Sequence, residues 1–226
     1  MLGFVFLLVM MVKGIDLGSA KTSTKTGTTT TTNTNTATTT TTPTLVDAAD
    51  ITIGENDYIR GNPDAKVTLV EFTDLECPFC KKFHPSIKNV FEANQDDVRW
   101  VYKHFPLSFH PEAKPAAVAA ECAGKLGGND TFWTYVDTLY DNQNDLGEDL
   151  YKQVAADLGL NADDYATCLD SGEFDAKIAA DQKLGQSVGV GGTPSTYVIA
   201  GDVAEKLNGA VPQTQVETAV ADALAR

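Results

Sequence analysis

Basic residues are scarce in this sequence. Among its 226 residues, 17 Lys and Arg stand against 31 Asp and Glu, and the formal net charge is −14. A protein that binds nucleic acid needs a basic surface that neutralises phosphates. The charge therefore argues against DNA or RNA as a partner, and it says little else about function.

Cysteine is also scarce, with four residues: Cys77, Cys80, Cys122 and Cys168. The chain is too long to be a disulfide-stapled miniature, so at least one pair should be chemical rather than structural. A zinc site needs about four ligands, and the sequence offers neither a second CxxC nor paired histidines. We therefore expect no metal site, and we expect His84 on the surface of a helix.

The N-terminal residues form an apolar run. This run, over residues 1–12, is shorter than the roughly 20 apolar residues that span a membrane, so it is typical of a signal-peptide core. Small residues at 18–20 suit a signal peptidase. We predict that residues 1–20 form a cleaved signal peptide or a retained membrane anchor, and a buried helix of the fold is the alternative. A signal peptide or an anchor would place the folded part outside the cytoplasm, in the periplasm or on the outer face of the membrane.

A threonine-rich tract follows, over residues 21–44. It has no apolar periodicity and cannot bury enough surface to offset the entropy of ordering. We predict a disordered linker there. The remaining residues, 45–226, suit one domain of ordinary size, which we expect to be a monomer.

The first half of that domain has the pattern of a βαβ unit. Nearly continuous apolar residues over 67–72 predict a strand that is covered on both faces. Helical spacing over 79–93 predicts a helix, and residues 98–102 predict a second strand. Together they imply a right-handed crossover.

The second half begins with helices, continues with two strands and ends with a helix. Residues from about 107 to 188 have mostly helical spacing. Strands are then predicted over 195–199 and 205–208, and a last helix over 212–224. The helical block is therefore inserted between a βαβ half and a ββα half.

Cys77-Pro78-Phe79-Cys80 is a CxxC motif that follows the first predicted strand and opens a predicted helix. A thiolate is the species that attacks disulfides, and a helix N-terminus lowers the pKa of a thiol because it favours negative charge. The spacing lets the second thiol resolve a mixed disulfide. We predict that Cys77 and Cys80 are a redox pair; half of a zinc site is the alternative.

A second signal is Gly191-Gly192-Thr193-Pro194, just before the third predicted strand. A proline in this place can follow a cis peptide bond, although an ordinary turn would give the same pattern. Together with a CxxC motif and a βαβ unit, this segment becomes a specific sequence signal, which an ordinary turn would not be.

From Tyr58 to Ala225 the chain resembles the DsbA-like family of thioredoxin-fold proteins. The resemblance is carried by Ala65-Lys66 with the strand at 67–72, the motif at 77–80, Phe105-Pro106-Leu107 and the segment 192–198. It implies an α/β thioredoxin fold, with βαβ and ββα halves around a central mixed sheet and an inserted helical subdomain over about 107–188.

The resemblance also implies a substrate-binding surface. It implies that Pro194 is cis and faces the CxxC, and that Thr193 offers backbone hydrogen bonds to a bound peptide. Strongly oxidising relatives have His at the position of Phe79, where it helps to stabilise the thiolate. Phe79 cannot do this, so the oxidising strength stays open, and we group it with the substrate-binding residues.

Two further roles rest on the same resemblance. Members often have a buried acid at the position of Glu71, where a raised pKa would let it relay the proton of Cys80; the alternative is a strand-end Glu that reaches solvent or Lys103. Some relatives have a structural disulfide in the helical block. We expect one between Cys122 and Cys168, with two buried free thiols as the alternative.

The expected function is an extracytoplasmic thiol–disulfide oxidoreductase that introduces disulfides into secreted or surface proteins. It would need no cofactor beyond the Cys77–Cys80 disulfide. Its partners would be unfolded or reduced secreted proteins and a membrane-bound, quinone-linked protein that reoxidises it. A disulfide reductase or isomerase is one alternative, and a non-catalytic thioredoxin-fold binding module is another.

Overall fold

The structure is a computed structural model, and it describes residues 44–226. The expected signal peptide or anchor over residues 1–20 lies outside the described residues, as does the expected linker over 21–44 except its last residue. That residue, Thr44, begins the first strand. In the described part, no helix is both long and apolar enough to cross a membrane.

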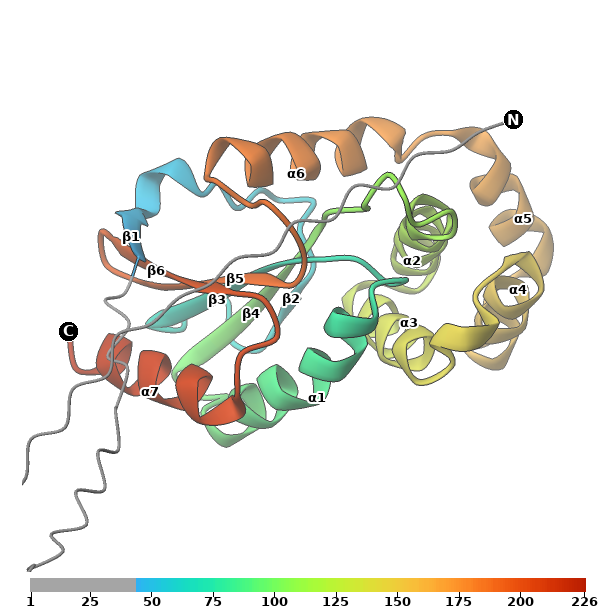
Figure 1. Cartoon of the computed structure of the whole chain (residues 1–226). Helices are drawn as coiled ribbons and strands as arrows, with labels where there is room; N and C mark the ends of the chain where they lie inside the picture. Colours follow the sequence, from blue (N-terminus) through green and yellow to red (C-terminus); the bar gives the residue numbers. More distant parts are fainter. Residues whose placement is uncertain (1–43) are drawn as a thin grey trace, which may run out of the picture. The chain divides into compact units, whose positions relative to one another are not determined.

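A six-stranded mixed sheet forms the centre of the described domain (Figure 1). Its strands are β1 (Thr44–Asp47), β2 (Ile59–Arg60), β3 (Val67–Thr73), β4 (Val98–His104), β5 (Ser195–Ala200) and β6 (Val203–Asn208). Their order across the sheet is β1-β6-β5-β3-β4-β2. β3 pairs in parallel with β4 and antiparallel with β5. This arrangement confirms the predicted α/β thioredoxin fold.

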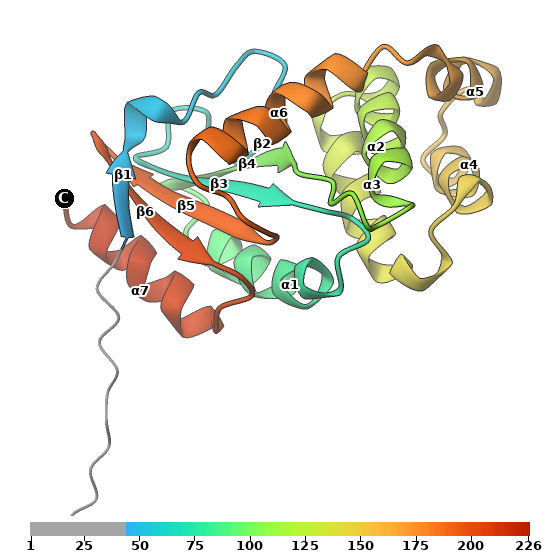
Figure 2. The same ribbon diagram turned by 45° about the horizontal axis from the view of Figure 1, so that its top comes forward.

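Helices cover both faces of the sheet (Figure 2). They are α1 (Pro78–Ala93), α2 (Ala113–Gly127), α3 (Asn129–Asp141), α4 (Glu148–Asp157), α5 (Ala162–Ser171), α6 (Asp175–Ser187) and α7 (Gln213–Leu224), with short 3-10 turns η1 (Ala48–Asp50) and η2 (Gln143–Asp145). α1 and α7 lie on one face, and α6 lies on the other.

The burial of β3 explains why its sequence is a nearly continuous apolar run. The strand is buried at every position, because successive side chains point into two different cores. Leu69 packs in the core that contains Ile87 of α1 and Val220 of α7. Val70 packs in the opposite core, against which Leu184 of α6 lies.

Helices α2 to α5 form a subdomain beside the sheet, at the end where β3 and β4 stop (Figure 2). α6 instead packs on the sheet through β3 and β4. The range expected for the insertion, about 107–188, therefore includes one helix that belongs to the layers of the sheet. The subdomain adjoins the turn that leaves β3, which is where the CxxC motif lies.

Candidate active site

The turn after β3 places the two cysteines of the motif at the start of α1. Cys77 is the N-cap residue, with an extended backbone at φ −70° and ψ 120°, and Pro78 is the first helical residue. Proline suits this position because it lacks an N–H and its φ is preset for a helix. Both cysteines are free thiols, and Cys80 is fully buried.

Cys77 is only 3% exposed, which is less than a position at a helix start suggests. The cause is the segment before β5, where the Thr193 carbonyl oxygen lies 3.5 Å from Cys77 Sγ and the Thr193–Pro194 bond is cis. The fold thus brings together two motifs that are 116 residues apart. Phe79, between the cysteines, has 63% of its surface exposed.

The two thiols differ in acidity. A hydrogen bond from the Cys80 thiol, followed by one from Thr193 and by bonds from the backbone N–H groups of Cys80 and Phe79, outweighs the opposing effect of burial and lowers the pKa of Cys77 from 9.0 to about 5. Burial, and next the neighbouring Cys77 sulfur, raises the pKa of Cys80 well above 9.0. Because the thiolate is the reactive species, the site is arranged for Cys77 to ionise first.

Glu71 lies in the interior, in the middle of β3. Its side chain has no exposed surface, and it accepts a hydrogen bond of 3.1 Å from Trp100 Nε1. Burial raises its pKa from 4.5 to about 8. Lys103 is bonded to Asp57 and Asp181 instead. The alternative in which Glu71 reaches solvent or Lys103 is therefore not what the structure contains.

Glu71 and Cys80 border the same buried hydroxyl groups. The pKa of both Tyr102 and Tyr140 is raised, chiefly by burial and further by the nearby charges of Cys80 and Glu71. The Thr73 hydroxyl lies 2.7 Å from the Tyr140 hydroxyl. The acid and the buried thiol thus share one polar region of the interior.

A family profile described as Thioredoxin matches residues 54–220. The chain belongs to the thioredoxin family. Its structural neighbours include proteins of the DsbA type. Both findings confirm the predicted family.

Two solved structures illustrate this similarity. Pseudomonas aeruginosa DsbA2 is 28% identical with a TM-score of 0.62, over 73% of this chain and 92% of that one. A thioredoxin-like oxidoreductase from Silicibacter pomeroyi DSS-3 is also 28% identical, with a TM-score of 0.67, over 76% of this chain and 95% of the other.

The curated relatives are larger proteins. One is a Na(+)/H(+) antiporter NhaA 1 of Mycolicibacterium gilvum, which is 35% identical over 147 residues. The match covers 64% of this chain and 23% of the antiporter. The chain therefore spans about a quarter of the length of the curated relatives it matches.

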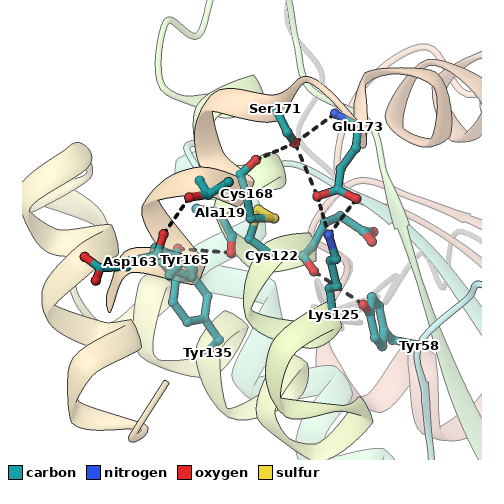
Figure 3. The surroundings of a disulfide bond; sticks show 12 residues. Tyr58, Ala119, Cys122, Lys125, Tyr135, Asp163, Tyr165, Cys168, Ser171 and Glu173 are labelled. Atoms are coloured by element: carbon teal, nitrogen blue, oxygen red, sulfur yellow. Dashed lines mark hydrogen bonds and ion pairs between the residues drawn. A yellow bond between two sulfur atoms is a disulfide. The ribbon is translucent and has the colours of Figure 1, made fainter. Parts of the chain in front are cut away.

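The second cysteine pair of this thioredoxin-family domain lies in the helical subdomain. Cys122 of α2 and Cys168 of α5 form a disulfide, with their Cα atoms 5.8 Å apart (Figure 3). Beside it, the Tyr165 hydroxyl donates to the Ala119 carbonyl and also joins α5 to α2. The alternative of two free thiols is therefore not what the structure contains.

His84 corrects an expectation. It was expected on the surface of a helix, but it is 5% exposed and its Nε2 lies 2.8 Å from an oxygen of Asp137. It follows Cys80 by one helical turn, and that spacing places both on the inner face of α1. Its ring packs against those of Trp100 and Tyr140.

Within residues 44–226, no cluster of three or more His, Cys, Asp or Glu could hold a metal ion.

Sequence reasoning missed the side chains that hold the turn before Cys77. The buried Asp74 carboxylate accepts from the N–H groups of Glu76 and Leu107, and His110 Nδ1 lies 2.7 Å from it. Gln143 donates to two carbonyls of the same turn. Asp74 has a usable signal, since it follows a strand directly; Gln143 is distant in sequence and has none.

Proposed function

We propose that this DsbA-like protein introduces disulfides into reduced proteins outside the cytoplasm. The supporting observation is the place of Cys77 at the start of α1, where the Cys80 thiol and two backbone N–H groups stabilise its thiolate. An oxidant of this type releases Cys77 as a stabilised thiolate, which favours transfer of the disulfide to the substrate.

The reaction proceeds by two exchanges. A substrate thiolate attacks Cys77 Sγ, a mixed disulfide forms, and the bond to Cys80 breaks. Glu71, whose pKa burial raises to about 8, holds a proton at neutral pH and gives it to the Cys80 sulfur. A second substrate thiolate then attacks the mixed disulfide, so that the substrate gains its disulfide and Cys77 leaves as a thiolate. Two electrons pass from the substrate to the pair.

The substrate lies along the segment that covers Cys77. The Thr193 backbone and Pro194 bind an extended peptide as an added strand, and the exposed ring of Phe79 contacts its side chains. Cys122 and Cys168 take no part in this reaction and hold the helical subdomain together.

The location and the partners belong to the same proposal. Residues 1–20 act as a signal peptide or anchor and the threonine-rich tract as a linker, so that the domain works as a monomer in the periplasm or on the outer face of the membrane. A periplasmic thioredoxin-like protein of Salmonella enterica serovar Typhimurium, 27% identical with a TM-score of 0.64 over 79% of this chain and 95% of that one, supports this location. Reduced secreted proteins are the substrates, and a membrane-bound, quinone-linked protein reoxidises the pair.

The reduction potential of Cys77–Cys80, measured in glutathione buffers, tests the direction of electron flow. An oxidase should have a potential well above roughly −270 mV, the value of thioredoxin. A potential at or below that value would favour the reductase or isomerase alternative, for which Phe79 in place of His is the supporting feature. In a second measurement, Cys80→Ala should accumulate substrate mixed disulfides on Cys77, and Cys77→Ala should accumulate few.

A further inference from the structure

A side chain of the helical subdomain reaches the redox motif. Gln143, in the η2 turn after α3, is 9% exposed, and its Nε2 donates to the carbonyl of Leu75 at 2.7 Å and to that of Cys77 at 3.0 Å. A glutamine amide nitrogen carries two hydrogens, so it can serve both carbonyls at once. The contact joins segments that are 66 residues apart in the chain.

The two carbonyls control how Cys77 enters the helix. The Cys77 carbonyl also accepts from the N–H of Lys81 at 3.1 Å, which is the first helical hydrogen bond of α1. The N–H groups of Phe79 and Cys80, which stabilise the Cys77 thiolate, belong to the same turn. Because Gln143 holds the Leu75–Glu76 peptide group and the peptide group that follows the Cys77 Cα, it restrains the turn on both sides of Cys77 and with it the direction of the thiol relative to those donors.

We propose that Gln143 is a positioning residue for Cys77, through which the helical subdomain sets the reactivity of the redox pair. The inference rests on the proposed function, in which Cys77 is the reactive thiol. It assigns to the subdomain a role at the redox site that is separate from its Cys122–Cys168 disulfide. Loss of the amide would leave two buried carbonyls with fewer donors and let the turn move.

Gln143→Met tests this inference, because methionine keeps the length of the side chain and removes both donors. Tyr135→Phe is the matched control. The Tyr135 hydroxyl is also buried in the subdomain, where it lies 3.0 Å from the Tyr151 carbonyl oxygen and 2.7 Å from the Tyr165 hydroxyl. The reduced full-length proteins are compared by urea unfolding, by thiolate absorbance across pH, and by the rate of alkylation with iodoacetamide.

Both variants should lose stability, but only Gln143→Met should raise the pKa of Cys77. We expect alkylation of the Gln143→Met variant near pH 5 to be about three- to tenfold slower than in the wild type. This is the effect expected if the displaced turn weakens one or two of the hydrogen bonds to the Cys77 thiolate. Gln143→Glu is the second variant. It keeps the shape and turns carboxylate oxygens toward the two carbonyls, so it should raise the pKa of Cys77 at least as much.

The outcomes separate this inference from the proposed function. If Gln143→Met and Gln143→Glu keep the wild-type pKa of Cys77 while their stability falls as in Tyr135→Phe, Gln143 is only structural and the inference is wrong. If the wild type itself has an ordinary thiol at Cys77 and exchanges no disulfides, the proposed function fails and the inference fails with it. A raised pKa in both Gln143 variants and an unchanged pKa in Tyr135→Phe support it.

Discussion

The chain uses cysteine in two different environments. Cys122 lies inside α2, Cys168 lies near the end of α5, and the two are bonded. Cys77 and Cys80 lie at the first turn of α1, and both are free. Inside a helix the backbone N–H groups are paired with carbonyls, whereas the first N–H groups of a helix have no such partner. Only the second environment can stabilise a thiolate.

The two pairs also differ in the loop that each bond closes. The bond between Cys122 and Cys168 spans 46 positions of sequence, and a bond within the CxxC closes a loop of minimal length. The entropy that a crosslink removes from the unfolded chain grows with loop length. The long loop therefore suits a bond that stabilises the fold, and the short loop suits a bond that opens and closes in each reaction.

Activity should separate the pairs most strongly. We expect Cys77→Ala to lose essentially all ability to oxidise a reduced, unfolded substrate protein, because no sulfur remains to form the mixed disulfide. The double variant with Ala at Cys122 and Cys168 should keep most of its activity at temperatures where it is folded. A folded double variant without activity would mean that these two cysteines belong to the path of electrons.

Thiol acidity should separate the two members of the redox pair. Cys77 should be alkylated with a midpoint near pH 5, and Cys80 only at strongly alkaline pH. At neutral pH, Cys77 should be almost wholly ionised and Cys80 almost wholly protonated, so Cys77 should be alkylated much faster than Cys80. Mass spectrometry of the reduced, alkylated protein identifies the modified cysteine. If Cys80 is modified first, the roles given to the two sulfurs are reversed.

The central part of the fold could be predicted from local pattern. β3 and α1 have the apolar spacing of a doubly covered strand and of an amphipathic helix, and they start and end within a residue or two of the expected bounds. β1 and β2 were missed because they have four and two residues and lie at the edges of the sheet, where no run of buried side chains marks them.

The residues of the site could be predicted only where they belong to a short sequence motif. Cys77, Cys80 and Pro194 belong to short segments with fixed spacing, so the sequence alone identifies them. The contacts of Gln143 and of His84 arise when the helical subdomain packs against α1. Such contacts depend on the tertiary fold, and a single sequence carries no pattern for them.

Stability should separate the pairs in the opposite sense from activity. Replacement of Cys122 and Cys168 by Ala should lower the free energy of unfolding by about 2–4 kcal/mol, since the crosslink no longer restrains the unfolded chain. The matched control replaces Cys77 and Cys80 by Ala and should change stability much less than this. Urea unfolding at neutral pH measures both. Equal losses in the two double variants would contradict the assignment of one structural and one redox pair.

A buried glutamate also lies near each cysteine pair. Replacement of the glutamate by glutamine should raise the stability of the protein at one site and lower it at the other. Glu71 is bonded to the neutral Trp100, and burial raises its pKa from 4.5 to about 8. Glu121, next to Cys122 in the chain, is bonded to Lys177 at 2.6 Å and to His104 at 3.0 Å. The folded protein keeps the Glu71 proton until about pH 8, but the unfolded chain loses it near pH 4.5. The stability that depends on Glu71 therefore falls as the pH rises through this window.

Glu71→Gln should remove that loss. In the oxidised protein, where Cys77 does not titrate, we expect the variant to match the wild type at about pH 4 and to exceed it by on the order of 4 kcal/mol at pH 8, as the raised pKa of Glu71 implies. Glu121→Gln should be less stable than the wild type at pH 8, because Lys177 loses one of its two carboxylate partners and keeps only Asp181. Urea unfolding at the two pH values gives both differences. If Glu71→Gln is less stable than the wild type at pH 8, Glu71 is ionised in the folded protein and holds no proton for Cys80.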